Sequence, residues 1–145
     1  MNFSVEPATE ALFGERARWR YPPPFDFYDD DGAPPLNPER FYSVLTDDGA
    51  IAGFYYFEQR GDAIFYGLGL RPDLIGRGLG EDFVCAGLEF ARERFGTKRF
   101  VLDVAEYNER AIHVYERAGF RKTRTKTRSF EGWGEVPFVD MELDG

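Results

Sequence analysis

Three glycines occupy alternate positions in the segment LRPDLIGRGLGEDF, residues 70–83, between a proline and the start of an expected helix. The first backbone amides of a helix have no acceptor within the helix, and the helix dipole adds positive potential at that end. Glycine also permits positive φ angles and close approach of the backbone, so several amides can converge on one anion. Gly76, Gly78 and Gly80 therefore predict a phosphate-binding turn, and the alternative is a tight strand-to-helix turn without a ligand.

The strand before this turn carries two more glycines. Gly67 and Gly69 lie inside the apolar run FYGLGL, where glycine often marks a β-bulge or the close approach of a ligand. A bulged strand with free amides, followed by an amide-rich turn, suits a long ligand that has a phosphate end and an amide-bearing arm. The G-x-G-x-G spacing is neither the dinucleotide fingerprint nor a P-loop, so a plain nucleotide-binding module lacks its usual signature.

Periodicity and turn signals predict the elements that position these residues. A loosely amphipathic helix is expected over 9–20, and the proline-rich segment 20–38 is expected to be irregular and a candidate binding loop. Strands are expected at 41–46, 51–59, 63–70, 99–105, 120–130 and 135–143, and helices at 79–95 and 108–118. This order predicts one α/β domain over 1–145: a three-layer sandwich of a mixed, mostly antiparallel sheet with helices on both faces.

The composition excludes several classes of function. The chain has 145 residues, of which 43% are hydrophobic, and its net charge of −8 argues against a nucleic-acid binder. One cysteine and one histidine exclude an intramolecular disulfide, a thiolate metal site and a His-rich metal site. Cys85 is expected to be a small core residue of a helix. No signal peptide and no membrane span are expected, which makes a cytoplasmic location the default.

Two segments together resemble a known family. The run LGLRPDLIGRGLGEDFV is similar to the acetyl-CoA-binding segment of the GNAT family of N-acetyltransferases, in which a strand, a proline and a Gly-rich loop follow one another. The run LDVAEYNERAIHVYERAGFRK is similar to a later segment of that family, with Asn, Ala, Tyr and Gly-Phe at matching intervals. Ile75 stands where the family usually has Gln or Arg, which predicts weaker or differently arranged cofactor binding. Arg71 and Arg77 are available for added charge contacts, and the alternative is that both are simply solvated.

The resemblance implies that acetyl-CoA is the cosubstrate and that the acetyl group passes directly to a primary amine of a small molecule or protein N-terminus. Pantetheine would lie where the strand ending at Leu70 splays from the strand containing Leu102. Its predicted backbone partners are Leu68, Gly69 and Leu70, and the predicted diphosphate-binding residues are Gly76, Arg77, Gly78, Leu79, Gly80 and Glu81. A nearby amide would stabilise the tetrahedral oxyanion.

The resemblance also implies two roles on the second predicted helix. Asn108 would hold pantetheine, and Tyr115, two helical turns later, would protonate the departing CoA thiolate. A phenol with a pKa near 10 keeps its proton at neutral pH, so it is a suitable donor. The residues alone favour a different interpretation, in which Tyr115 is a core aromatic at helical spacing.

The acceptor ammonium must lose a proton before it attacks, directly or through water. Asp103, in the apolar strand RFVLDVA, is the first candidate for the base, because partial desolvation makes a carboxylate a better proton acceptor. The alternative is a strand carboxylate that points to solvent or caps a turn. Glu106 and Tyr107 are second choices, and His113 is expected to lie on the helix surface.

The sequence is less informative about the acceptor. Segment 19–31 combines aromatic residues with four aspartates, which either hold an alkylammonium or guanidinium group or pack on the core with the acids in water. The alternation KTRTKTR places its basic residues, Lys122, Arg124, Lys126 and Arg128, on one expected strand face. Such a face is solvated or protects an edge, or it approaches cofactor phosphates or an acidic partner.

Two questions of function and assembly also stay open on the sequence. A non-catalytic module that binds or senses acyl-CoA on the same fold is the alternative to the enzyme, because a fold does not guarantee its chemistry. Exposed edge strands leave a homodimer open.

Overall fold

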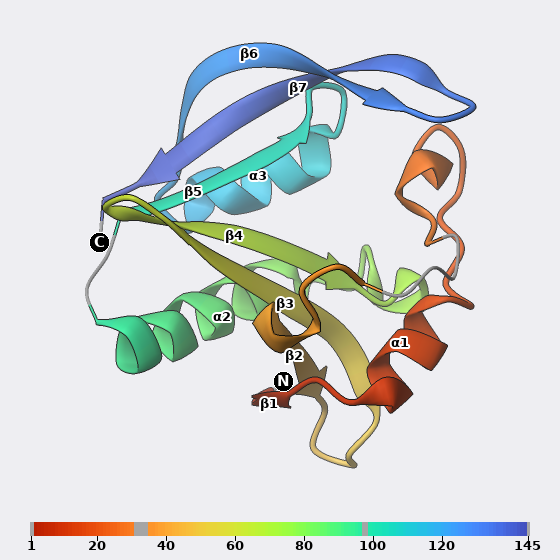
Figure 1. Cartoon of the computed structure of the whole chain (residues 1–145), viewed down its shortest axis with the longest axis vertical. Coiled ribbons are helices and arrows are strands. Elements are labelled where there is room, and N and C mark those ends of the chain that lie inside the picture. The colour runs from red at the N-terminus through yellow and green to blue at the C-terminus, as the bar shows by residue number, and fades with distance from the viewer. Residues whose placement is uncertain (1, 31–34, 97–98, 145) are drawn as a thin grey trace.

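The computed structural model describes residues 2–30, 35–96 and 99–144 (Figure 1). Its strands are β1 (Ser4–Pro7), β2 (Phe41–Leu45), β3 (Ile51–Arg60), β4 (Ala63–Leu70), β5 (Arg99–Ala105), β6 (Arg121–Phe130) and β7 (Gly134–Leu143). Its helices are α1 (Glu10–Arg16), α2 (Gly80–Phe95) and α3 (Glu109–Arg117), with short 3-10 helices at Asp26–Tyr28, Pro38–Arg40 and Pro72–Leu74. From residue 41 onward the predicted boundaries are correct to within one residue.

The N-terminal part differs from the prediction. Helix α1 has 7 residues and ends at Arg16, so the expected helix over 9–20 is too long. The sequence also does not predict β1, a strand of 4 residues that ends in a proline and pairs only with β2. Four residues without alternating hydrophobicity carry no periodic signal in the sequence. Strand β1 therefore depends on its pairing with β2.

The strands form one sheet in the order β1-β2-β3-β4-β5-β7-β6. The pair β4–β5 is parallel and the other neighbouring pairs are antiparallel. The parallel pair requires a crossover connection, which α2 provides. The predicted mixed, mostly antiparallel sheet is therefore confirmed.

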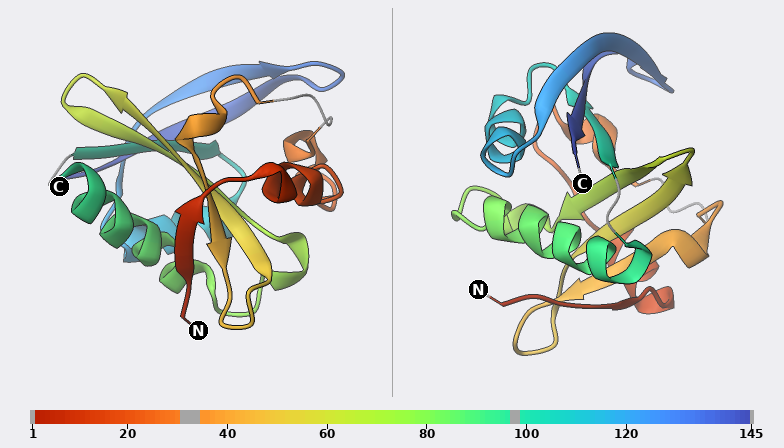
Figure 2. Two further views of the ribbon diagram at one scale, coloured as in Figure 1. Left: turned by 60° about the horizontal axis from the view of Figure 1, so that its bottom comes forward. Right: turned by 90° about the vertical axis from the view of Figure 1, so that its left-hand side faces the viewer.

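Helices cover both faces of this sheet (Figures 1 and 2). On one face, Phe13 of α1 packs edge-on against Phe41 of β2. On the other face, Phe83 of α2 packs against Tyr55 of β3, and Ile112 of α3 belongs to the same buried cluster. The predicted three-layer sandwich is confirmed. None of the helices in the described part of the chain is both long and apolar enough to cross a bilayer.

Two buried tyrosines fix α2 on the sheet. The Tyr55 hydroxyl donates to the Phe83 carbonyl oxygen over 2.5 Å, and the Tyr66 hydroxyl donates to the Val84 carbonyl oxygen over 3.0 Å. A Cβ atom on Gly87, one turn further along α2, would meet both tyrosines, with Cε1 of Tyr55 at 2.9 Å. Glycine at this position therefore lets the start of α2 lie close against β3 and β4.

We expect Gly87→Ala to lower the free energy of unfolding by about 2–3 kcal/mol, because a methyl group is forced into occupied space. Gly14→Ala is the matched control, since Gly14 is also helical but its Cβ position is open. The control should be neutral or stabilising by up to about 1 kcal/mol, because alanine has the higher helix propensity. Urea denaturation measures both. A Gly87→Ala protein as stable as the parent would contradict the close packing of α2.

Candidate active site

The two parallel strands at the centre of the sheet separate along their length (Figure 1). The pairing of β4 with β5 ends at Phe65 and Val101, although β4 continues to Leu70 and β5 to Ala105. The remaining part of each strand directs main-chain groups toward the other without a ladder between them. The predicted splay between the strand ending at Leu70 and the strand containing Leu102 is confirmed.

Backbone hydrogen bonds show which main-chain groups of β4 face this splay. Alternate residues of an antiparallel strand direct their N–H and C=O groups to the same neighbour. The Arg71 amide donates to the Ala52 carbonyl oxygen over 2.7 Å, on the β3 side. By alternation, the main chain of Gly69 also turns to β3, while Leu68 and Leu70 direct theirs across the splay. Leu68 and Leu70 thus present the open edge of β4. The prediction that Gly69 is a third backbone partner of pantetheine is wrong, because its main chain faces β3.

The glycines of β4 do not mark a bulge. Strands β3 and β4 keep one register through Tyr56↔Gly67 and Phe54↔Gly69, so the expected bulged strand is wrong. A Cβ on Gly69 would collide with the Phe54 ring, and a Cβ on Gly67 would lie 3.2 Å from Tyr56 Cβ. The glycines make room for two aromatic side chains of β3 that lie across them.

The loop before α2 presents free main-chain amides. Gly76 and Gly78 have φ angles of 82° and 77°, which glycine adopts at no steric cost. Among the described residues, no protein oxygen accepts a hydrogen bond from the amides of residues 76–81, and Leu79 makes no side-chain cap. The Phe83 amide is the first to donate in the pattern of the helix, to the Leu79 carbonyl oxygen. This geometry suits the anion-binding turn that the sequence predicts.

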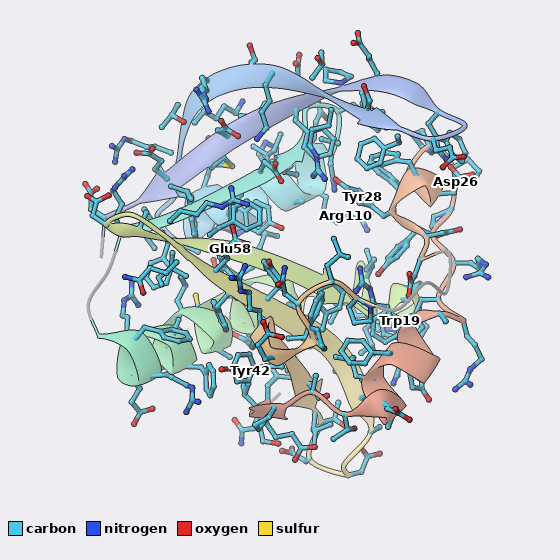
Figure 3. The ribbon with its side chains drawn as sticks, in the orientation of Figure 1. Trp19, Asp26, Tyr28, Tyr42, Glu58 and Arg110 are labelled. Carbon is cyan, nitrogen blue, oxygen red and sulfur yellow. The ribbon has the colours of Figure 1, made fainter. Side chains whose placement is uncertain are left out.

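Arg110 brings a cation to this loop that sequence reasoning missed (Figure 3). It lies in the first turn of α3, and its Nη1 atom is 3.2 Å from the Cβ position of Gly76. Helices α2 and α3 are in contact beside this loop, as shown by the 3.2 Å between the Cβ position of Gly80 and Cγ2 of Val114. The only signal in the sequence is the charge itself, since contact between the loop and α3 depends on tertiary packing.

Three further residues near the loop, Arg71, Ile75 and Arg77, differ in their contacts and exposure. Arg71 donates from Nε to Asp73 over 2.6 Å and from Nη1 to the Ile51 carbonyl oxygen over 2.8 Å. The expectation that Arg71 is available for charge contacts with a ligand is therefore wrong. Arg77 is exposed, and Ile75 is 38% exposed at the position where the family usually has a polar side chain.

Tyr115 combines core packing with a polar environment. Its ring packs edge-on against Phe120 with centroids 6.1 Å apart, and the side chain is half-buried. Burial, followed by the influence of Tyr28 and Asp103, raises the pKa of Tyr115 above its usual value of 10.0. A phenol in this setting keeps its proton at neutral pH and remains a proton donor.

Asn108 is the N-cap of α3. Its Oδ1 atom accepts a hydrogen bond from the Ala111 amide over 3.3 Å, and its φ and ψ angles of −85° and 68° lie outside the helix. Asn108 therefore precedes the helical residues, and the prediction that two helical turns separate it from Tyr115 does not hold. The side-chain Nδ2 atom has no acceptor among the described residues, so it can still donate to a ligand.

Asp103 belongs to an ion-pair network on the sheet face opposite α2. Lys126 Nζ lies 3.0 Å from Oδ2 and Arg128 Nη1 lies 3.4 Å from Oδ1, while the carboxyl side chain is 11% exposed. Lys126 also contacts Asp140 at 2.9 Å. Each carboxylate oxygen of Asp103 therefore already has a cationic partner on β6. The role of Asp103 as base stays a prediction.

The basic residues of β6 do not all share one face. The register shifts between Lys122, which pairs with Met141, and Arg124, which pairs with Asp140. This irregularity reverses the alternation, so Lys122 lies on the face opposite Arg124 and the single basic face expected over 122–128 is wrong at Lys122. The residues on the face of Asp103 are Arg124, Lys126 and Arg128. A bulge depends on pairing with β7 and leaves no mark in the spacing of charges.

Segment 20–30 bridges the open ends of β4 and β5 (Figure 3). The Tyr21 hydroxyl donates to the Leu70 carbonyl oxygen over 3.1 Å, and the Tyr28 hydroxyl accepts from the Ala105 amide over 3.3 Å. The two rings meet edge-on at 6.5 Å. Burial raises the pKa of both phenols to about 12. The segment therefore places two neutral phenols at the mouth of the splay, on the side away from α2.

The remaining rings and acids of this segment mostly serve its own packing. Phe27 is 7% exposed, with its ring centroid 4.9 Å from that of Phe130 in the β6–β7 hairpin. Asp29 accepts a hydrogen bond from the Tyr21 amide over 2.8 Å. Asp31 lies outside the described residues. For Phe27 and Asp29, the interpretation as structural residues agrees with these contacts.

Other reactive residues lie at the surface. Cys85 is exposed on α2, so the expectation of a core residue is wrong. Partial desolvation and nearby carboxylates raise the pKa of its thiol, which makes it a poor nucleophile. His113 is exposed, as expected. Glu106 and Tyr107 are also exposed in the turn after β5, where the Tyr107 hydroxyl donates to the Pro24 carbonyl oxygen over 3.2 Å.

Sequence comparisons identify relatives of this chain. A profile of the acetyltransferase (GNAT) family matches residues 7–120. The mycothiol acetyltransferase of Clavibacter sepedonicus is 41% identical over 87 residues, which are 59% of this chain and 28% of that protein. The mycothiol acetyltransferase of Rhodococcus jostii (strain RHA1) is 38% identical over 89 residues, 57% of this chain and 29% of that protein. The chain thus spans less than a third of the length of these relatives.

Solved structures share the fold over nearly the whole chain. A GNAT-family acetyltransferase from Bacillus anthracis has a TM-score of 0.78 at 12% identity and covers 99% of this chain and 95% of its own. The ribosomal-protein-S18-alanine N-acetyltransferase from Escherichia coli has a TM-score of 0.70 at 17% identity, with 99% and 94% covered. GNAT acetyltransferases use acetyl-CoA as cosubstrate. With residues 7–120 matched to the family profile, the chain belongs to the acetyltransferase (GNAT) family.

Proposed function

We propose that this chain is an acetyltransferase domain that moves an acetyl group directly from acetyl-CoA to a primary amine. One observation carries the proposal: the open edge of β4 leads straight into a loop whose amides have no acceptor among the described residues. An extended, amide-bearing ligand with a diphosphate at one end would satisfy both sets of groups.

The proposed contacts with acetyl-CoA follow from these groups. The main chain of Leu68 and the amide of Leu70 pair with the pantetheine arm, while the Leu70 carbonyl oxygen accepts from the Tyr21 hydroxyl. Gly69 leaves room beside this edge for the Phe54 ring. The amides of Gly76, Arg77, Gly78, Leu79, Gly80 and Glu81 hold the diphosphate. Arg110 adds a positive charge beside Gly76, and Asn108 donates from Nδ2 to the pantetheine arm. When bound, acetyl-CoA supplies the activated acetyl thioester.

The proposed chemistry uses groups on both sides of the splay. A main-chain amide at the open edge of β4 donates to the developing oxyanion, an effect usually worth about 3–4 kcal/mol. Tyr115 holds the proton that neutralises the departing thiolate. Asp103 accepts the proton of the acceptor ammonium, directly or through one water molecule.

The first experiment measures CoA release with a thiol reagent over a panel of amines. The panel contains alkylamines, amino acids, spermidine and a peptide with an N-terminal alanine. Spermidine is included because the spermidine/spermine N-acetyltransferase of Vibrio cholerae shares the fold with a TM-score of 0.74, and the peptide because of the alanine N-acetyltransferase of Escherichia coli. Turnover with at least one amine supports the enzyme. Tight CoA binding without turnover of any amine would instead support the non-catalytic sensing module. The identity of the acceptor amine, the formation of a homodimer and a location in the cytoplasm are likewise proposals for this chain.

The role of Asp103 has its own test. We expect Asp103→Asn to lower kcat/KM about 100-fold, which is the lower end for loss of a general base. Arg128→Gln is the control, because it removes one partner of Asp103 and keeps the carboxylate. If the kcat/KM of Asp103→Asn falls no further than that of Arg128→Gln, Asp103 only orders the ion pairs.

A further inference from the structure

A polar cavity of about 420 Å³ lies on the sheet face opposite α2, where β4 and β5 begin to separate. Phe65 and Val101, the last pair of the parallel ladder, form part of its lining. Its charged lining residues are Arg60, Arg124, Lys126, Asp140 and Glu142. Asp103, which the proposed function places at the reacting amine, shares Lys126 with this cavity.

The carboxylates of the cavity already have cationic partners on both oxygens. Asp140 accepts from Arg124 Nε at 2.6 Å and from Lys126 Nζ at 2.9 Å. Burial alone would raise the pKa of Asp140, but these two hydrogen bonds lower it below its usual value. Glu142 likewise lies 2.9 Å from Arg99 and 3.7 Å from Arg121. A cationic ligand would find no unpaired carboxylate oxygen on these two residues.

The guanidinium groups, in contrast, keep unused donors. Arg60 donates from Nε to Glu58 over 2.6 Å, and its guanidinium lies 4.1 Å above the centroid of Phe65. Arg124 likewise donates from Nε to Asp140. Over residues 2–30, 35–96 and 99–144, no protein acceptor is paired with the Nη atoms of Arg60 or Arg124. Both arginines line the cavity, and a guanidinium group binds a planar carboxylate through two parallel hydrogen bonds.

We propose that this cavity binds a carboxylate of the acceptor, so that the acceptor is an amine with a carboxylate several bonds away. The inference rests on the proposed acetyl transfer and narrows its substrate class. Phe65 lies three residues before Leu68 on β4, which corresponds to about 10 Å along the strand. A free α-amino group is too close to its own carboxylate to span this distance. An ω-amino carboxylate or a short peptide with an accessible amine can span it.

The test compares linear ω-amino carboxylates of increasing length with n-alkylamines of the same length, using CoA release as the readout. We expect kcat/KM for the carboxylate to exceed that for the alkylamine by about tenfold at the best length, since one charged contact of this kind is lost in the alkylamine. Arg124→Gln and Arg60→Gln should each reduce this preference severalfold. Lys122→Gln is the matched control, because Lys122 lies on the same strand but on the opposite face, and it should keep the preference.

Two results would overturn the carboxylate site: an alkylamine preferred at every length, or a preference that survives both arginine substitutions. Failure of the proposed function is distinguishable from failure of the site. If no amine is acetylated, saturation-transfer NMR with 6-aminohexanoate decides: binding that Arg124→Gln removes supports the site, and no binding to the parent protein overturns it. Melting temperatures close to that of the parent exclude unfolding as the cause.

Discussion

The Tyr115→Phe protein is expected to bind CoA as tightly as the parent and to turn over about 100-fold more slowly or worse, because loss of a positioned general acid typically costs at least that factor. The substitution removes one hydroxyl and keeps the ring packed on Phe120. Calorimetry with CoA and initial rates of CoA release separate binding from turnover. Tyr42→Phe is the control, since the Tyr42 hydroxyl accepts from Arg94 on α2, away from the splay.

The pH profile adds a second readout for Tyr115. Burial raises the pKa of this phenol above 10.0, and a general acid acts in its protonated form. Loss of the acid by ionisation therefore begins only above pH 10, so the parent should show no fall in kcat from this group between pH 7 and about 10. A Tyr115→Phe protein with unchanged kcat would remove Tyr115 from the role of acid.

The Gly78→Glu protein is expected to lose CoA affinity by about 100-fold or more. The Cβ position of Gly78 is open, so the new carboxylate projects beside the free amides and repels the diphosphate. The positive φ angle adds about 1 kcal/mol of backbone strain. Gly49→Glu is the matched control. Gly49 lies in the β2–β3 turn and, like Gly78, has a positive φ angle, 84°, and an open Cβ position.

The comparison of these two glutamate variants isolates the charge at the loop. Both should lose a similar free energy of unfolding, which urea denaturation measures, whereas only Gly78→Glu should lose CoA binding. Equal CoA affinity of the two variants would mean that the loop amides do not hold the diphosphate.

The fold was predictable where the sequence carries strong periodic signals. Strands β2 to β4 are bounded by short turns, and α2 has a broad apolar face that ends at Gly96, so their boundaries follow from local patterns. Strand β1 and the short helix α1 depend on contacts with distant residues. The sequence carries only weak signals for them.

The candidate site was predictable in part, for a related reason. The residue type and spacing of Gly76, Gly78 and Gly80 indicate the loop directly. The family resemblance predicts the separation of β4 from β5. Arg110 and the tyrosines of segment 20–30 reach the site through tertiary packing, which no local pattern encodes. Lys122 changes face because of an irregularity in the β6–β7 ladder. The bulge expected at Gly67 and Gly69 was wrong, since cross-strand rings also explain glycine in a strand.

A calorimetric titration of the purified protein with CoA, ATP and pantetheine tests the joint role of the β4 edge and the loop amides most directly. CoA is expected to bind with a Kd on the order of 1 μM, about −8 kcal/mol. Pantetheine, which lacks the diphosphate, should bind at least about tenfold more weakly, and ATP, which lacks the amide-bearing arm, should not compete at equal concentration. No heat with CoA, or ATP binding as tightly as CoA, would contradict a site built from these two elements.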